Sequence, residues 1–165
     1  MAGTSSSQSI RKWTPSLSFY FQVVFQKMNK EPFRVSFAGV EGLSWDMGKR
    51  VYPGNGGEFH VVPTGLTYTN LVLKRPLGPL SGAFAKWLKE CHDFVYKVRK
   101  QKKLKAIPTY DVVIHLLDEK SEPKASWQCI RAYPMKWSLG NFDSTKTMLA
   151  AETIELAYAY MERVK

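Results

Sequence analysis

The sequence has few cysteines and lacks long apolar runs. Its two cysteines, Cys91 and Cys129, are too few for a disulfide scaffold and do not form a C-x-x-C pair. We therefore expect two reduced thiols, packed in the core of a protein made in the cytosol. No stretch approaches the roughly 18 apolar residues that a membrane-spanning helix needs. Residues 1–13 lack the apolar segment of a secretory signal. The sequence therefore predicts neither a membrane span nor a signal peptide.

Acidic residues are also scarce: 14 of them are set against 24 basic residues in a chain of 165, for a formal net charge of +10. Much of the excess lies in one run without an acidic member, made of Lys97, Arg99, Lys100, Lys102, Lys103 and Lys105. A solvated link between two elements would explain this run, and so would a surface that meets phosphate groups or an acidic protein. Because Tyr96 and Tyr110 flank the run, a small basic β-domain that binds single-stranded nucleic acid is an alternative function.

Most of the chain alternates between apolar and polar residues, with the two-residue period of β-strands. The predicted strands fall at 17–26, 33–37, 66–74, 107–117 and 126–133. Residues 84–95 instead show helical spacing, and Ser81 is suited to cap that helix. The expected core contains Phe19, Phe21, Phe25, Trp87 and Trp127. Residues 1–16 are rich in serine and are predicted to form a flexible tail before a single domain at 17–165.

Two segments are ambiguous from local patterns. Residues 48–58 contain four glycines and one proline and are predicted to form a mobile loop, without the Gly-Lys-Ser/Thr ending of a P-loop. Residues 147–164 have the composition of a helix, yet apolar and polar residues alternate from Ile154 to Tyr160 as in a strand. With about seven strands and one helix, we expect a mainly β fold of two antiparallel sheets, a sandwich or barrel. Such a fold must close its sheet edges or pair them with a neighbour.

No residue pattern predicts catalysis or metal binding. The three histidines, His60, His92 and His115, are far apart, and neither a Gly-x-Ser-x-Gly elbow nor a His-Glu-x-x-His motif occurs. Glu152 and Glu155 would point to opposite faces of a strand, so they would not act as an acid–base pair. We therefore expect a protein that is not an enzyme and that has no catalytic residues, no metal and no cofactor.

Several short segments share their order and pattern with one known family. They are FAGVEGLS at 37–44, LTYTNLVLKR at 66–75, a helical Trp87-Leu88, DVVIHLLD at 111–118, a hairpin Trp127, AYPMKW at 132–137 and AETIELAY at 151–158. Over residues 17–162 the sequence thereby resembles the tail-tube proteins of contractile phage tails and of the related extracellular contractile injection systems.

The resemblance implies a two-sheet antiparallel β-barrel or sandwich with one flanking α-helix, similar to the Hcp tube protein of type VI secretion. It also implies that the C-terminal segment is a strand. Six copies would join their sheets edge to edge in a ring, and rings would stack into a hollow tube that a contracting sheath drives forward. The implied partners are further copies of the chain, sheath and baseplate proteins and cargo in the lumen, with nucleic acid only in a phage tail. The protein would assemble in the cytoplasm and end in a virion tail or a released injection particle.

Two sets of residues receive roles within that hypothesis. The segment at 48–58 is predicted to make ring-to-ring contacts through Lys49, Arg50, Tyr52, Asn55 and Glu58. The basic run at 97–105 is predicted to lie on the tube exterior or a ring face, opposite an acidic sheath lining or baseplate ring. The alternative for this run is a lumen coat that suits acidic cargo or nucleic acid.

Overall fold

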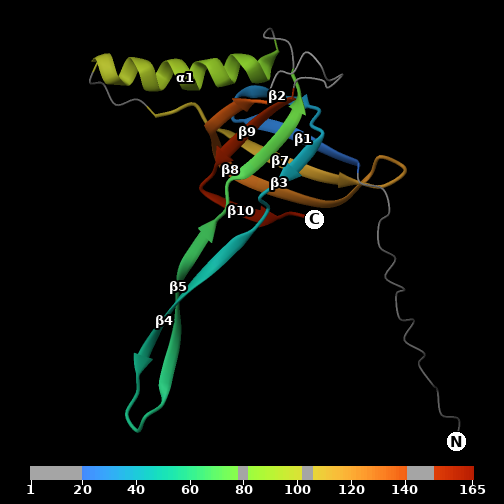
Figure 1. The fold of residues 1–165 in the computed structure, drawn as a ribbon. Coiled ribbons are helices and arrows are strands. Elements are labelled where there is room, and N and C mark those ends of the chain that lie inside the picture. Colours follow the sequence, from blue (N-terminus) through green and yellow to red (C-terminus); the bar gives the residue numbers. More distant parts are fainter. Residues whose placement is uncertain (1–19, 78–81, 102–105, 141–150) are drawn as a thin grey trace, which may run out of the picture.

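The computed structural model describes residues 20–77, 82–101, 106–140 and 151–165, which form ten strands and one helix (Figure 1). In chain order the elements are β1 (Tyr20–Lys27), β2 (Lys30–Val35), β3 (Gly39–Glu41), β4 (Trp45–Pro53), β5 (Phe59–Tyr68), β6 (Leu71–Pro76), α1 (Ala83–Gln101), β7 (Tyr110–Leu117), β8 (Pro123–Leu139), β9 (Ala151–Ala157) and β10 (Tyr160–Arg163). Every pairing between these strands is antiparallel. The fold is mainly β with one helix, as predicted, and its C-terminal segment forms strands.

The long strand β8 belongs to two sheets. Its first half pairs with β7 on one side and β10 on the other, which gives a first sheet in the order β2-β1-β7-β8-β10. Its second half, residues 133–139, pairs with β9 and gives a second sheet in the order β8-β9-β6-β3. The strand changes sheets at a bulge beside Arg131, which has a φ of 55° and whose backbone N–H donates to Asp111 Oδ1 at 2.8 Å. A strand that changes sheets at a bulge makes the corner of a sandwich.

The sheets do not close on themselves within the described residues. The path of paired strands is open and has β2 at one end and β3 at the other. Of the two expected architectures, the described strands therefore form the sandwich and not a closed barrel. In Figure 1 the helix α1 lies on one side of the sandwich, and the hairpin of β4 and β5 extends from the opposite side.

Aromatic side chains fill the core between the sheets and α1. Phe25 of β1 and Trp87 of α1 are 0% and 1% exposed, and their ring centroids lie 5.5 Å apart. Phe21 is partly buried and packs against this cluster, whereas Phe19 lies outside the described residues. Trp127 differs from the expectation because it remains partly exposed. Its cross-strand neighbour Arg163 of β10 covers part of the ring, with the guanidinium carbon 5.8 Å from the ring centroid.

The prediction of a mobile loop at 48–58 is wrong, because most of these residues belong to the β4–β5 hairpin. The glycines are concentrated where the hairpin turns. Gly56 and Gly57 have φ values of 100° and 86°, and the Gly54 N–H donates to the Glu58 carbonyl at 2.7 Å to close the turn. Asn55-Gly56 between two apolar runs is a hairpin signal that could have revealed this structure from the sequence.

The single strand predicted at 66–74 is also wrong, because the structure has two strands separated by residues 69 and 70. The break lies where the hairpin leaves the second sheet. There Ser44 Oγ donates to Thr69 Oγ1 at 2.8 Å, which holds the two hairpin ends together. Gly42 approaches the backbone so closely that a Cβ would lie 2.0 Å from the Asn70 carbonyl oxygen. No other residue type fits this position without moving the chain.

Candidate assembly surfaces

His115 makes a contact between two strands of the first sheet. Nδ1 of His115 lies 2.7 Å from Ser126 Oγ, and the two residues are direct cross-strand partners in β7 and β8. Burial, assisted by the charge of Arg34, lowers the pKa of His115 below its usual value of 6.5. In the part of the chain that the structure describes, no group of three or more His, Cys, Asp or Glu residues could hold a metal ion.

The two C-terminal glutamates lie on opposite faces of β9, as the strand reading requires. Glu152 is buried and accepts hydrogen bonds from Arg75 Nε and, at 2.8 Å, from Trp137 Nε1. Glu155 pairs with Lys136 Nζ at 3.0 Å on the other face of the second sheet. Glu152 therefore connects β9 to β6 and β8 inside the molecule, whereas Glu155 makes an ion pair on its surface.

The outer face of the second sheet carries balanced charges. Besides the Lys136–Glu155 pair, it holds an ion pair between Lys74 of β6 and Glu41 of β3, with Nζ and Oε1 2.5 Å apart. Both pairs join neighbouring strands, and each couples one cation to one anion. The excess positive charge of the chain does not arise from these four side chains.

The sheet edges are the first candidate assembly surface. Of the described strands, β2, β3 and β10 each pair on one side only, as do the hairpin strands β4 and β5 and the second half of β8, residues 133–139. β3 and residues 133–139 are the two margins of the second sheet. Backbone N–H and C=O groups along such margins can pair with a strand of another chain.

The β4–β5 hairpin is the second candidate surface, because all residues of its two strands except the partly buried Tyr68 are exposed. The register of the two strands divides the side chains between two faces. The first, here called the hairpin apolar face, carries Trp45, Met47, Lys49, Val51, Pro53, Phe59, Val61, Pro63, Leu66 and Tyr68. The second, the hairpin polar face, carries Asp46, Gly48, Arg50, Tyr52, His60, Val62, Gly65 and Thr67.

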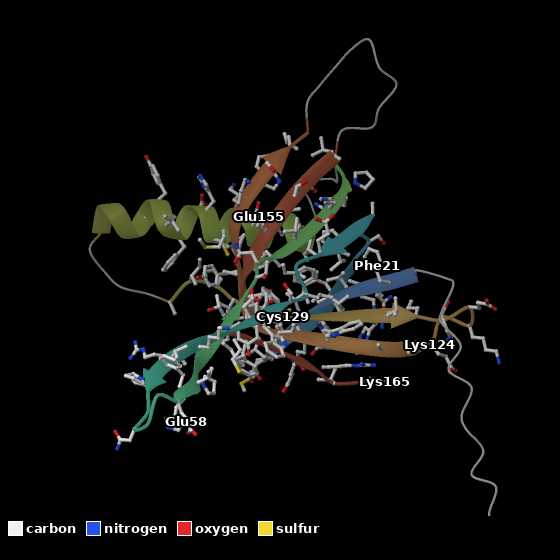
Figure 2. All side chains as sticks on the ribbon, turned by 60° about the horizontal axis from the view of Figure 1, so that its bottom comes forward. Phe21, Glu58, Lys124, Cys129, Glu155 and Lys165 are labelled. Atoms are coloured by element: carbon white, nitrogen blue, oxygen red, sulfur yellow. The ribbon has the colours of Figure 1, made fainter. Side chains whose placement is uncertain are left out.

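The residues predicted to make ring-to-ring contacts are divided by this geometry. Arg50 and Tyr52 lie on the hairpin polar face, with Arg50 Nη1 3.5 Å from the Tyr52 hydroxyl, and Lys49 lies on the hairpin apolar face. Asn55 and Glu58 lie at the tip, and Figure 2 shows Glu58 far from the body of the sandwich. The sequence analysis therefore missed the most extensive feature of the segment, its apolar face, because it treated the segment as a loop.

A groove of about 670 Å³ lies between α1 and the second half of β8. Its apolar lining includes Leu88 and Val95 of α1 and Met135 and Trp137 of β8, with the Arg75–Glu152 pair also contributing. Val95, Met135 and Trp137 are all more than half exposed. We call this feature the α1–β8 groove. Its apolar lining is open to solvent and next to an unpaired strand edge.

The basic run begins inside α1 and not in a link after it. Lys97 is exposed on the helix, and residues 99 and 100 also belong to α1. Lys102, Lys103 and Lys105 lie outside the described residues. Within the described residues no helix is long and apolar enough to span a membrane.

Open sheet edges and an amphipathic hairpin define a β-sandwich with exposed surfaces that other chains can contact. Comparison of the sequence with known protein families gives a consistent result. The family model of the T4-like virus tail tube protein gp19 matches residues 17–162, and the chain belongs to this family. No curated protein sequence matches the chain.

Solved structures extend the comparison to injection systems. A chain in the cryo-EM structure of the anti-feeding prophage baseplate is 25% identical, with a TM-score of 0.72 over 92% of this chain and 97% of that chain. A chain of the PVC sheath-tube complex, from an extracellular contractile injection system in the extended state, is 20% identical, with a TM-score of 0.71 over 98% of both chains. Hcp1 from Flavobacterium johnsoniae is 13% identical, with a TM-score of 0.52 over 88% of this chain and 95% of that chain. The chain is thus a member of the tail tube protein family, and its fold is similar to that of chains in contractile injection systems.

Proposed function

We propose that the chain is the inner-tube subunit of a contractile phage tail or injection system, in which six copies form a ring and rings stack into a hollow tube. The observation that carries this proposal is the open second sheet, whose two margins, β3 and residues 133–139, each pair on one side only in the described chain. The similar baseplate structure is six-fold symmetrised, which supports a ring of six. Such a protein is not an enzyme, because its task is to form a conduit.

Edge-to-edge pairing would extend the second sheet from one copy to the next. If β3 of one copy pairs with residues 133–139 of its neighbour, the second sheets of all copies form one continuous barrel. The outer face of this sheet, with the Lys74–Glu41 and Lys136–Glu155 pairs, would then line the lumen. Paired charges would give passing cargo little net attraction to this wall.

The hairpin and the basic run would serve the higher assembly. We assign the hairpin tip, with Asn55 and Glu58, to ring-to-ring contact; deletion of 52–57 should leave rings intact and prevent long tubes. We assign the basic run to the acidic sheath lining or an adjoining baseplate ring, and the alternative is a lumen coat for acidic cargo or nucleic acid. Reversing the charges of Lys100, Lys102 and Lys103 should weaken one of these associations, and unchanged association with both would overturn both assignments.

Negative-stain electron microscopy of the purified protein tests the proposed function. Six-fold rings, alone or stacked, are expected. The competing function, a basic domain that binds single-stranded nucleic acid, predicts monomers whose binding to an oligonucleotide weakens steeply as salt rises. Monomers with that behaviour, and no rings over a range of protein concentrations, would overturn the tube proposal. The same microscopy on particles released from cells tests assembly in the cytoplasm and export as a tail or injection particle.

A further inference from the structure

We infer that Glu41 of one copy forms an ion pair with Lys136 of the next copy, and that these two charges select which sheet margins pair. The inference rests on the proposed tube function and goes beyond it, because it names the side chains that choose and align the contact between copies. It involves neither the hairpin nor the basic run.

The outer face of the second sheet carries one charged side chain on each of its four strands. From one margin to the other these are Lys136 of β8, Glu155 of β9, Lys74 of β6 and Glu41 of β3, here called the charged row. The sign of the charge therefore alternates from strand to strand. Opposite charges across neighbouring strands stabilise a sheet, and like charges directly opposite destabilise it. The charged row thus supports the observed strand order.

The charged row ends in an anion at one margin and a cation at the other. Glu41 lies on β3 and pairs with Lys74, while Lys136 lies at the opposite margin and pairs with Glu155. The side chains at the margins, Glu41 and Lys136, are 61% and 63% exposed. Their partners on the inner strands are only 45% and 27% exposed. The two margin charges therefore have the most room for a further partner of opposite sign.

The strand register places the two margin charges in line. Lys136 is directly opposite Glu155. Glu155 is opposite Val72, and Val72 is opposite Glu41. If the next copy continues this line, its Lys136 lies directly opposite Glu41. A closed barrel staggers its strands; with a stagger of two residues the two side chains would be diagonal neighbours, which long side chains still span.

The opposite signs also discriminate against wrong pairs of edges. Two β3 edges brought together would place two Glu41 carboxylates close to each other, and two copies of residues 133–139 would do the same with Lys136. Both arrangements are symmetric contacts that end in a dimer. A contact of β3 with residues 133–139 joins two different edges and can close a ring. The ion pair therefore favours the ring, and the alternation of charge would continue without a break around the lumen wall.

Two double variants test the ion pair, because each reverses the charge at one margin and keeps the ion pair beside it. The β3-margin variant is Glu41→Lys/Lys74→Glu, and the β8-margin variant is Lys136→Glu/Glu155→Lys. Alone, each would place like charges at every contact between copies. The protein concentration at half-maximal ring formation, measured by sedimentation, should then rise by at least about fivefold. Mixed one to one, the two variants should assemble nearly as well as wild type, in rings of equal composition by native mass spectrometry.

The fourfold variant, which combines all four changes, is the matched control. It restores opposite charges within and between copies, so it should form rings alone at the wild-type concentration. Mixed with wild type, it would bring like charges together at every mixed contact. Mixed rings should therefore be depleted by at least about fivefold relative to random mixing. Urea unfolding of the dissociated proteins shows whether each variant is folded.

Wild-type assembly by both double variants alone would overturn the ion pair. Weak assembly of folded double variants that mixing does not restore would overturn it as well, because the charges would then not act on each other. If a double variant does not fold, free mixing of the fourfold variant with wild type would overturn the pair. In all these cases wild-type rings would leave the tube proposal standing, whereas a wild-type protein that forms no rings would overturn both.

Discussion

Glu152→Ala should be among the most damaging substitutions outside the aromatic core. The Glu152 and Arg75 side chains are only 5% and 12% exposed, and Trp137 Nε1 donates to the same carboxylate at 2.8 Å. Removal of the carboxylate leaves a guanidinium without its counter-charge and an indole N–H without its acceptor. Breaking a buried pair in this way costs about 3–5 kcal/mol. With a urea m-value of about 2 kcal/mol/M, the unfolding midpoint should fall by roughly 1.5–2.5 M.

Glu155→Ala is the matched control, because Glu155 lies on the same strand and pairs with Lys136 on the exposed face. An exposed pair contributes about 0–1 kcal/mol, so this variant should shift the midpoint little. The double variant Arg75→Met/Glu152→Leu should recover most of the loss, since no charge stays buried. Tryptophan fluorescence in urea, at one fixed protomer concentration, measures all three variants. A cost for Glu152→Ala no larger than that for Glu155→Ala would refute this reasoning.

Three further predictions concern the core and the titrating groups. Phe25→Ala should lower the free energy of unfolding by about 3–5 kcal/mol through the cavity it leaves, and a loss below about 1 kcal/mol in urea would contradict its central packing. Because burial and Arg34 lower the pKa of His115, the unfolded chain binds this proton more readily than the folded chain. The free energy of unfolding should therefore fall as pH falls below 6.5, less so in His115→Gln; parallel profiles of the two proteins would argue against it. Burial raises the pKa of both Cys91 and Cys129 to about 12, so iodoacetamide at pH 8 should label neither thiol until urea unfolds the protein, as mass spectrometry would show.

The regular strands could be predicted because their side chains alternate. β1, β7 and the start of β8 each have one face in the core, so the sequence shows the two-residue period. For the C-terminal segment the composition favoured helix, and the alternation that favoured strand reflects Ile154 and Leu156 facing the core. Packing against β6 and β8 outweighs the helix propensity of these residues.

Core-facing alternation did not indicate the hairpin, because neither of its faces is covered by other described residues; only the Asn55-Gly56 turn signal pointed to it. In the sequence, the apolar residues of this hairpin are interrupted by glycines, and the glycines led to the prediction of a loop. The buried Glu152 was also missed: its partners Arg75 and Trp137 come from distant strands, and only the sheet order β8-β9-β6 brings them together. A local sequence pattern contains neither the register of the hairpin strands nor the order of distant strands in the sheet.

Hydrogen–deuterium exchange at the sheet edges tests the central claim most directly. Backbone amides of β3 and of residues 133–139 are compared between dilute, dissociated protein and concentrated, assembled protein, with buried strand β7 as the internal reference. The account predicts that amides on the unpaired sides of both edges become strongly protected upon assembly, while those of β7 stay protected throughout. Edge amides that exchange at the same rate in both states would contradict the claim that sister copies complete these sheets.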